Sequence, residues 1–222
     1  MTSRTYAQNC GLARAMDVLG ERWTILVVRE LTLGPRRYGD LLDGLPGIGT
    51  NMLAARLKSL EAADVIRRAT LPPPASVNVY ELTDRGEELR PILRRLGLWG
   101  YDLAPFDPAR ATRASWALLS MQTRADPQAV AELAALVELH VGEEVLWVRS
   151  SDAGTDLRLG QAPAPPDLTI TCDGPTFGAI ALGQLSPTAA LRQGRLEIEG
   201  HRRLLTRFFT VYRLPPAVPV TA

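Results

Sequence analysis

The stretch GERWTILVVRELTLGPRRYGDLLDGLPGIGTNMLAARLKSLE, residues 20–61, decides the fold of the first part of the chain. It holds apolar helical segments on both sides of a turn, and Gly47-Ile48-Gly49 in that turn raises the question of a phosphate-binding loop. Such a loop needs a third glycine and a preceding strand, but Thr50-Asn51-Met52 follows the pair and Leu45-Pro46 precedes it. The sequence Gly-Lys-Ser/Thr occurs nowhere in the chain. We therefore interpret the two glycines as turn residues in front of a helix.

The segments around this turn follow the order of a winged helix-turn-helix. Residues 23–31 are apolar on most sides, which predicts a buried central helix that Gly34-Pro35 ends. A short helix is predicted over 38–42, a turn over 44–49 and a longer helix over 50–63. The two strands of a hairpin follow over 65–71 and 77–82. A proline-rich tip, 72–76, joins the strands. In such a motif the second helix enters the major groove of DNA.

The helix over 50–63 has two different faces. At about 100° per residue, Leu53, Leu57 and Leu60 cluster within about 60° and are expected to point inward. Opposite them lie Asn51, Ala55 and Lys58, with Ala54 and Ser59 at the margins, and Arg56 falls nearer the apolar side. Asparagine can pair with adenine, alanine with thymine methyls, and lysine with guanine or phosphate. Taken alone, the helix is better explained as an ordinary amphipathic helix with a solvated face. The candidate DNA contacts are Arg36, Arg37, Thr50, Asn51, Ala54, Ala55, Lys58, Arg67 and Arg68.

The four arginines in this set are candidate phosphate contacts. For at least one arginine of each pair, Arg36-Arg37 and Arg67-Arg68, we expect no more than a role in surface solubility. The whole chain has a net charge of +1, with 14 basic against 12 acidic residues up to residue 104 and 11 against 12 after it. DNA binding would therefore use a few placed charges and not a basic field.

Residues 10–101 resemble the HxlR-type regulators, a bacterial winged-helix family related to MarR. The matching motifs are an N-terminal cysteine (Cys10) and the sequences LGERWTILVVREL, RRYGDLLDGLPGI, MLAARLKSLE and YELTDRGEEL. The resemblance implies a homodimer that reads a near-palindromic operator. Gly49 stands where the family often has a serine, so Thr50 is expected to cap the following helix instead.

Two further features of this region carry predictions. The helices predicted over 11–19 and 84–101 have apolar faces larger than a small core needs, so we expect them to form the dimer interface. Cys10 has two interpretations. Some members of the resembling family use a cysteine here as an oxidant or electrophile sensor, and a helix N-terminus lowers a thiol pKa. A free cysteine beside Leu12 and Ala13 is more often a small buried hydrophobe, which is the interpretation we favour.

Length and composition suit two domains of an α+β protein. We place a winged helix-turn-helix domain over 1–104, a proline-bearing joint over 105–111, a second domain over 112–214 and a loose tail over 215–222. Two cysteines cannot make a disulfide framework, and neither a secretory signal nor a membrane-spanning run is present, which favours a reducing cytoplasm without membrane association.

The second domain is predicted to combine strands, over 135–141, 144–150, 156–160, 167–172 and 195–199, with helices over 114–121, 176–182, 187–192 and 201–212. In its first strand the valines and Leu139 are expected to be buried, with Glu138 and His140 on the outer face. The sequence DLTITCDGPTFGAIALGQLSPTAALRQGRLEIEG (167–200) resembles the sterol-carrier-protein-2-like fold, whose domains often hold an apolar ligand between sheet and helices. Adjacent aromatics Phe208 and Phe209 are the best hint of a cavity, because both cannot face one core. The alternative is that all these side chains are core. The candidate pocket residues are Trp147, Ile170, Phe177, Ile180, Phe208, Phe209 and Tyr212.

We find no catalytic pattern. The two histidines, His140 and His201, lack metal-ligand spacing, and the chain has neither Cys-x-x-Cys nor Gly-x-Ser-x-Gly. The sequence therefore predicts a dimeric bacterial transcriptional regulator that is not an enzyme, with no metal or cofactor. Its expected partners are double-stranded DNA, a second copy of itself and an apolar small molecule in the second domain. The alternative is a lipid carrier or scaffold that does not bind DNA and uses its winged helix for dimerisation.

Overall fold

The computed structural model of the 222-residue chain describes residues 5–72, 76–101, 103 and 113–214. It divides into two units, Met1–Leu93 and Arg94–Ala222, and buried apolar residues form a core in each. The division falls inside helix α6 (Leu89–Tyr101) and not after residue 104. The joint expected over 105–111 and the tail expected over 215–222 lie outside the described residues, so both stay predictions.

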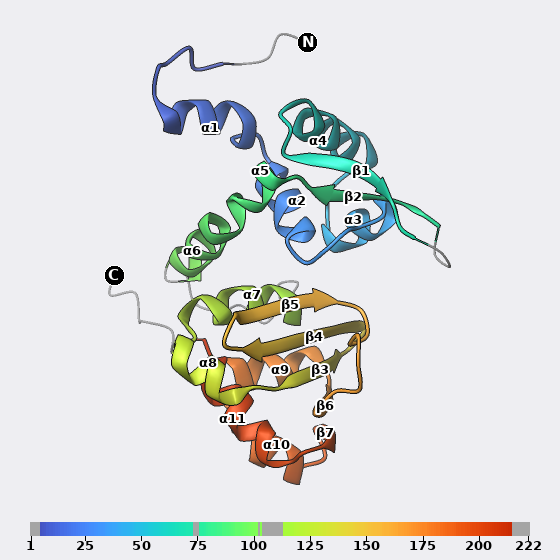
Figure 1. Ribbon diagram of the computed structural model, residues 1–222, viewed down its shortest axis with the longest axis vertical. Coiled ribbons are helices and arrows are strands. Elements are labelled where there is room, and N and C mark those ends of the chain that lie inside the picture. The colour runs from blue at the N-terminus through green and yellow to red at the C-terminus, as the bar shows by residue number, and fades with distance from the viewer. Residues whose placement is uncertain (1–4, 73–75, 102, 104–112, 215–222) are drawn as a thin grey trace. The chain divides into compact units, whose positions relative to one another are not determined.

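The first unit has the order of elements expected for a winged helix-turn-helix (Figure 1). Strands β1 and β2 form an antiparallel hairpin, and Arg36 adds an isolated bridge to Tyr80 at its edge. The elements before α6 are α1 (Gly11–Leu19), α2 (Thr24–Leu31), α3 (Tyr38–Gly44), α4 (Thr50–Ala62), β1 (Ile66–Thr70), β2 (Asn78–Leu82) and α5 (Asp84–Glu87). Residues 73–75, within the predicted hairpin tip, lie outside the described part.

The core of this unit forms around α2, as the sequence predicts. Val27, Val28 and Leu31 of α2 are buried and pack in one cluster with Leu53 and Leu57 of α4. Full burial of such a side chain contributes roughly 1.5–3 kcal/mol of hydrophobic free energy. The period of 3.6 residues in α4 therefore fixes which side of this helix packs inward and which side remains in solvent.

The helix expected over 84–101 is in fact two helices, because Glu88 is a turn between α5 and α6. Pro91 supplies the physical reason: it has no N–H to donate to the carbonyl of Glu87, and proline is tolerated only in the first turn of a helix. Thr83 caps α5 by accepting a hydrogen bond of 3.1 Å from the Gly86 N–H. A Cβ at Gly86 would collide with the carbonyl oxygen of Val65, so the tight junction needs glycine.

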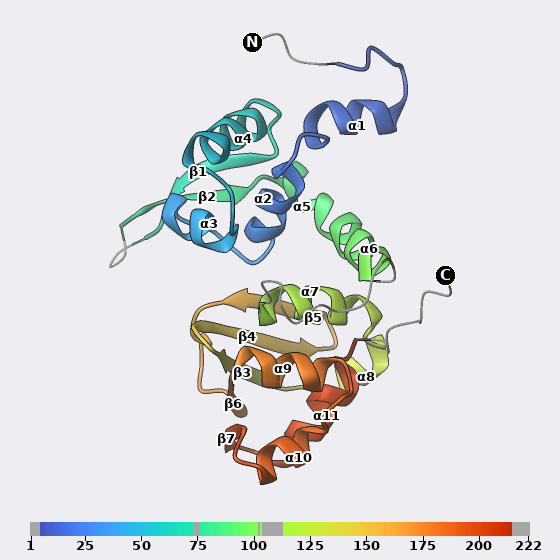
Figure 2. The ribbon, with the colours of Figure 1, turned by 180° about the vertical axis from the view of Figure 1, so that it is seen from behind.

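The second unit contains one mixed sheet with strand order β5-β4-β3-β6-β7. Strands β3 and β6 are parallel, and the other neighbours are antiparallel. Helices α9 and α11 lie against one face, which Figure 2 shows from the helix side. The elements are α7 (Ala114–Arg124), α8 (Pro127–Leu133), β3 (Leu136–Val141), β4 (Glu144–Ser151), β5 (Gly154–Leu159), β6 (Leu168–Cys172), α9 (Gly174–Ala181), α10 (Pro187–Arg192), β7 (Leu196–Gly200) and α11 (Arg203–Val211).

Helix α8 was not among the expected elements, although the sequence signals its start. Asp126 accepts a hydrogen bond of 2.9 Å from the Ala129 N–H, and Pro127 occupies the first helical position. An acidic N-cap followed by proline is a recognised helix start. Strand β3 behaves as predicted: Val137, Leu139 and Val141 are buried, while Glu138 and His140 lie on the other face of the sheet.

Candidate DNA-binding face and apolar pocket

Helix α4 exposes the residues that the sequence assigns to DNA. Asn51, Ala54, Ala55 and Lys58 are all exposed, as is Thr50 at the start of the helix. Opposite them, Leu53, Leu57 and Leu60 are buried. The predicted division of the helix into an inner and an outer face is therefore confirmed. The outer face carries one amide, one ammonium group and two methyl groups that no part of the core uses.

The prediction that Thr50 caps α4 is wrong. Gly49 occupies the N-cap position and no side chain caps the helix. Thr50 is already helical, and its carbonyl oxygen accepts a hydrogen bond of 2.8 Å from the Tyr38 hydroxyl. This contact ties α4 to α3. The turn before α4 uses Gly47 at φ +91°, a backbone conformation that residues with a side chain rarely adopt.

A second contact fixes α4 from the side. Arg56 is half-buried, and its Nη2 lies 3.3 Å from Glu21 Oε2 and 3.3 Å from the sulfur of Met52. Glu21 precedes α2, so this ion pair joins the recognition helix to the segment between α1 and α2. The sequence places Arg56 near the apolar side of the helix, and the structure confirms that.

The four candidate phosphate arginines differ in their surroundings. Arg36 is 16% exposed, and its Nη2 lies 3.4 Å from a carboxylate oxygen of Glu30, which is 1% exposed. Arg37 is exposed; its backbone N–H donates a 3.1 Å hydrogen bond to Asp40, and its carbonyl oxygen accepts one of 3.1 Å from the Leu41 N–H. Of its pair, Arg36 is thus the one with a structural partner, which the sequence could not reveal because nothing in the pattern marks Glu30 as buried.

The arginines of the hairpin are both well exposed but paired. The Nε of Arg67 lies 2.7 Å from Oε1 of Glu81, and the Nε of Arg68 lies 2.9 Å from Oε1 of Glu61. Arg68 also stacks over the ring of Tyr80 at 5.5 Å. Exposed ion pairs of this kind contribute little to stability, so either guanidinium can exchange its carboxylate for another anion at small cost.

The helices predicted to form a dimer interface keep large apolar side chains in solvent. Leu12 of α1 is 71% exposed, and Ile92 and Trp99 of α6 are 58% and 62% exposed. Leu96, also on α6, is 41% exposed. Apolar side chains gathered on helix faces in this way are typical of surfaces that a partner covers.

Cys10 is exposed, which contradicts our favoured interpretation of it as a small buried hydrophobe. It occupies the N-cap position of α1, and the backbone N–H groups of Ala13 and Leu12 lower the pKa of its thiol. With Tyr6, Leu12 and Met16 it lines a hollow of about 340 Å³. The other cysteine, Cys172, is buried in β6, and desolvation raises its pKa to about 11.

Most of the candidate pocket residues of the second unit are packing residues. Ile170 and Phe177 are fully buried, and Phe208 and Phe209 are both buried with their rings edge to face at 5.3 Å. The expectation that these two adjacent aromatics cannot share one core is wrong, because both belong to one cluster of rings: the ring centroid of Phe209 lies 6.1 Å from that of Phe177, and that of Phe208 lies 5.0 Å from that of Tyr212. Trp147 lies on the other face of the sheet, beside Arg149.

Tyr212 closes the core with a polar contact. Its hydroxyl lies 2.8 Å from the hydroxyl of Ser150 and 2.8 Å from that of Thr155, on two neighbouring strands. Burial raises the pKa of Tyr212, and these two hydrogen bonds oppose the rise. The side chain therefore anchors the end of α11 to the sheet and contributes no lining to a cavity.

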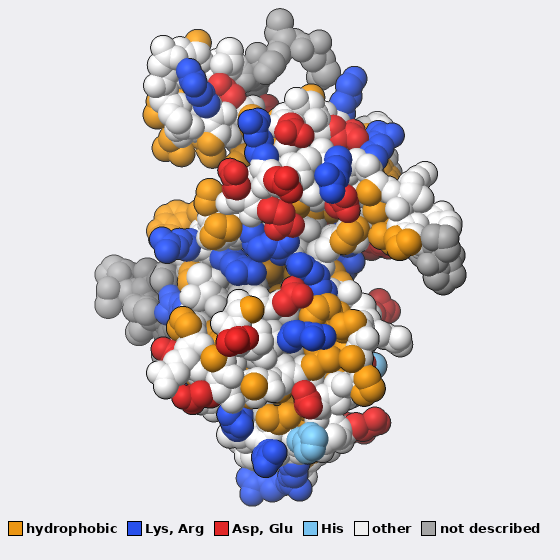
Figure 3. All heavy atoms as spheres, in the orientation of Figure 1, with side chains coloured by type: hydrophobic (Ala, Val, Ile, Leu, Met, Phe, Trp, Pro, Cys, Tyr) orange, Lys and Arg blue, Asp and Glu red, His pale blue; other side chains and the backbone are white. Residues whose placement is uncertain are grey.

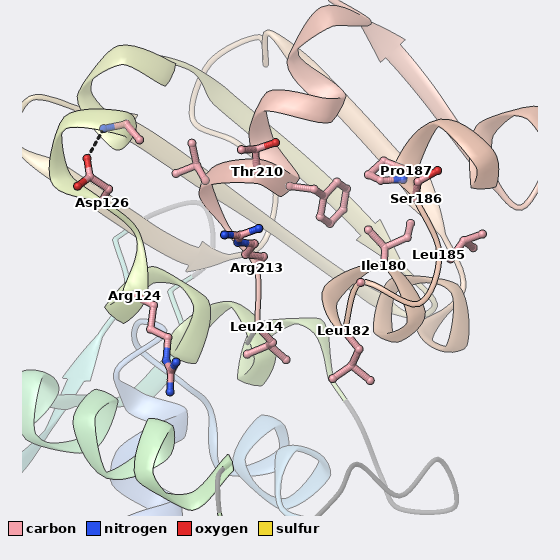
Figure 4. Close-up of a pocket in the computed structure, with 14 residues that line it drawn as sticks. Arg124, Asp126, Ile180, Leu182, Leu185, Ser186, Pro187, Thr210, Arg213 and Leu214 are labelled. Atoms are coloured by element: carbon pink, nitrogen blue, oxygen red, sulfur yellow. Dashed lines mark hydrogen bonds between the residues drawn. The ribbon is translucent and has the colours of Figure 1, made fainter. Parts of the chain in front are cut away.

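A pocket of about 890 Å³ lies beside this core and not within it. Of the seven candidate residues, Ile180 and Phe209 line it. Figure 4 shows Arg213 near the middle of the lining group, with Arg124 and Asp126 at one end and Leu185 with Pro187 at the other. Its further apolar lining comes from Leu182, Val211 and Leu214. The lining is mixed, because polar side chains stand beside the apolar ones: Arg124, Asp126, Ser186, Thr210 and Arg213.

The described residues contain no group of three or more His, Cys, Asp or Glu side chains that could hold a metal ion. His140 lies 2.7 Å from Glu138 on the sheet face away from α9 and α11. Burial alone would raise the pKa of Glu138, but hydrogen bonds from the Ala162 N–H and from His140 outweigh it and lower that pKa. None of the helices in the described ranges is long and apolar enough to cross a membrane.

Comparisons with known proteins agree with this architecture. The HxlR-like helix-turn-helix family matches residues 18–107, and the SCP-2 sterol transfer family matches residues 117–213. An uncharacterised HTH-type transcriptional regulator of Synechocystis sp. is 42% identical over 93 residues, which are 42% of this chain and 69% of that protein. The HTH-type transcriptional regulator YodB of Bacillus subtilis is 34% identical over 85 residues, 38% of this chain and 76% of YodB.

A solved structure of the reduced form of YodB is 31% identical, with a TM-score of 0.39, and covers 45% of this chain and 100% of that one. Each of the two family matches covers most of one unit, and together they cover most of the described chain. The chain therefore belongs to the HxlR-like helix-turn-helix family of transcriptional regulators, and its second unit is a domain of the SCP-2 sterol transfer family.

Proposed function

We propose that the chain is a bacterial transcriptional regulator that binds a near-palindromic operator as a homodimer and responds to an apolar small molecule. The observation that carries the proposal is the outer face of α4, where Asn51, Ala54, Ala55 and Lys58 are exposed on a helix whose other side is buried. It is a DNA-reading face by its chemistry as well as by its family.

The roles of the individual residues follow from that chemistry. Asn51 presents an amide that matches the N6 and N7 edge of adenine, and the methyl groups of Ala54 and Ala55 suit thymine methyls. Lys58 reaches a guanine or a phosphate, and Thr50 lies at the end of α4 that approaches the groove first. Arg37, Arg67 and Arg68 contact the phosphate backbone of the DNA. Arg67 and Arg68 do so by exchanging their carboxylate partners for phosphates.

Dimerisation supplies the symmetry that a palindrome needs. The exposed side chains Leu12, Ile92, Leu96 and Trp99 support an interface formed by α1 and α6. Two recognition helices must sit about one DNA turn, roughly 34 Å, apart to occupy successive major grooves. A change in how the α6 helices of the two copies pack together alters the distance between the recognition helices, and with it the affinity for the operator.

The pocket of about 890 Å³ in the second unit supports the ligand response. A ligand switches DNA binding only if it binds the DNA-competent and incompetent states with different affinities. Helix α11 contributes Phe209, Thr210 and Val211 to the lining, so a bound ligand acts directly on this helix. The protein would carry out this function in the cytoplasm, where its two free cysteines stay reduced.

A second candidate function is thiol sensing at Cys10. Its exposure and lowered pKa favour reaction with an oxidant or electrophile, since the thiolate is the reactive form. The hollow with Tyr6 and Leu12 offers apolar contact to an electrophile. Loss of operator affinity after treatment with diamide, restored by a thiol, would support this switch, and unchanged affinity would remove it.

The test of the main proposal is footprinting of the purified protein on its own genomic DNA, with and without a hydrophobic extract of its cells. On a fragment found in this way, Asn51→Ala should lose about 1–3 kcal/mol of binding and relax base preference at one position. Lys58→Ala should weaken binding to all sequences and make the slope of log K against log salt less negative by about 0.9.

Gln128→Ala on helix α8 of the second unit is the matched control and should bind like the wild type. Wild-type affinity in both α4 variants would move the reading face elsewhere. No salt-dependent affinity in the wild type would favour the rival function, a lipid carrier or scaffold whose winged helix serves only for dimerisation.

A further inference from the structure

The second unit has a strongly uneven distribution of charge along its sequence. Of the eleven arginines after residue 104, six lie between 192 and 213, where Glu197 and Glu199 are the only carboxylates. Residues 105–191, in contrast, contain five arginines and ten carboxylates. The near-neutral total therefore hides a basic end on an otherwise acidic domain. We refer to five of these residues together as the arginine surface: Arg192, Arg195, Arg202, Arg203 and Arg207.

The arginine surface spans three consecutive elements, and helix α10 packs against both β7 and α11. Arg192 and Arg195 precede β7, whereas Arg202 and Arg203 follow its end, so the strand separates the two pairs. All five side chains are exposed. Figure 3 shows basic side chains gathered over α10 and the beginning of α11, at the end of the unit.

The two carboxylates of this segment lie on the other side of the sheet. In β7, Leu196 is buried and Ile198 half-buried, while Glu197 and Glu199 are exposed and pair across β6 with Thr171 and Thr169. Alternation in a strand places them on the face opposite to α10 and α11. Arg195 has a different acidic neighbour: hydrogen bonds from Thr176 lower the pKa of Asp173, and the nearby charge of Arg195 lowers it further. Arg207 does make one contact, a 2.8 Å hydrogen bond to the carbonyl oxygen of Glu132, which leaves its charge in place.

Two of these charges oppose the dipole of their helix. Arg202 and Arg203 stand at the N-terminus of α11, where the helix dipole disfavours cations, and the first turn holds no acidic residue. Proteins break such local rules mainly at functional or strained sites. Two other exposed residues of α11, Thr206 and Thr210, have small hydroxyl side chains that also bind phosphates.

We propose that the arginine surface binds the phosphate backbone of the DNA duplex beside the operator, as a second DNA contact in addition to α4. The inference rests on the proposed DNA-binding function. Arginine forms bidentate hydrogen bonds with phosphate, and a duplex offers one phosphate charge per roughly 1.7 Å of its axis. Because the first unit already holds DNA, the second meets phosphates at high effective concentration.

An anionic membrane is the competing partner, and the composition of α11 argues against it. Membrane-surface helices place large apolar side chains beside their basic ones. Here Leu204, Leu205, Phe208 and Phe209 are buried in the unit, and arginine and threonine occupy the outer side. Nothing apolar on this side of α11 is left to enter a bilayer.

The test measures binding of the full chain to a long mixed-sequence duplex by fluorescence anisotropy over a range of salt concentrations. Arg202→Gln/Arg203→Gln removes two charges from the arginine surface. Each lost phosphate contact makes the slope of log K against log salt less negative by about 0.9, so we expect a change of roughly 1.8. Arg192→Gln/Arg195→Gln is the second variant and should act in the same direction. Arg149→Gln/Arg158→Gln, on β4 and β5, removes the same charge elsewhere and should leave the slope unchanged.

Equal slopes in the wild type and both arginine-surface variants would overturn the proposal. A less negative slope for Lys58→Ala in the same assay would still support DNA binding by α4. An equal loss in the Arg149/Arg158 control would also overturn it, because the effect would then follow total charge. Loss of binding to phosphatidylglycerol vesicles with an unchanged DNA slope would assign the surface to membranes. A wild type without DNA affinity would refute the proposed function and this contact together.

Discussion

Replacing Arg36 by alanine separates its structural role from a DNA-binding one. The carboxylate of Glu30 is 1% exposed and has guanidinium nitrogens of Arg29 at 2.7 Å and Arg36 at 3.4 Å. Removing one partner of a buried ion pair typically costs 3–5 kcal/mol when the remaining charge is uncompensated. Because Arg29 remains and the Arg36 contact is long, we expect a smaller loss of about 1–2 kcal/mol in the stability of the first unit.

For a unit of this size, 1 kcal/mol shifts the melting temperature by roughly 4–8 °C, so the Arg36→Ala transition should fall by about 5–15 °C. Hydrogen exchange of peptides from α2 reports on the first unit specifically and should show faster exchange. Arg37→Ala is the matched control, since Arg37 is exposed: we expect stability within about 0.5 kcal/mol of the wild type.

The two variants should also differ in DNA binding. Under conditions where both are folded, Arg37→Ala should make the salt slope less negative by about 0.9, and Arg36→Ala should leave it unchanged. Adding Glu30→Gln to Arg36→Ala should not recover the lost stability, because Arg29, whose side chain is 22% exposed, would then lose its carboxylate partner. The reasoning is refuted if Arg36→Ala keeps the stability of the wild type and flattens the salt slope.

Three further outcomes are expected. Leu96→Arg places a charge in the predicted dimer interface and should yield monomers with weak DNA binding; a dimer that persists in analytical ultracentrifugation would move the interface away from α6. A chain cut after Ala104 should still bind the operator but ignore apolar ligands that release the full-length protein, and indifference of both to a broad ligand panel would make the second unit a structural module. Iodoacetamide should alkylate Cys10 well before Cys172, because the Cys10 pKa is lowered and that of Cys172 is raised to about 11. As pH rises, the Cys10 rate should level off at a lower pH than for an ordinary thiol, and equal rates for the two cysteines, followed by mass spectrometry, would contradict this.

The sequence by itself determined the elements of both units and the faces of their helices and strands. The leucines of α4 and the alternation in β3 repeat with the period of the backbone, so burial of one side follows from local geometry. The same kind of information was present but overlooked at two places. Pro91 marks the break between α5 and α6, and Asp126-Pro127 marks the start of α8.

The tertiary structure decided which side chains meet. Nothing in the order of residues shows that Arg36 and not Arg37 reaches Glu30, that Phe208 and Phe209 share a core, or that the pocket lies beside that core. The arginine surface likewise depends on the fold. Its arginines lie on or beside α10, β7 and α11, and the alternation of β7 turns Glu197 and Glu199 to the other face of the sheet. Periodicity acts over a few residues, whereas partners and cavities depend on how elements pack, and packing is a property of the whole domain.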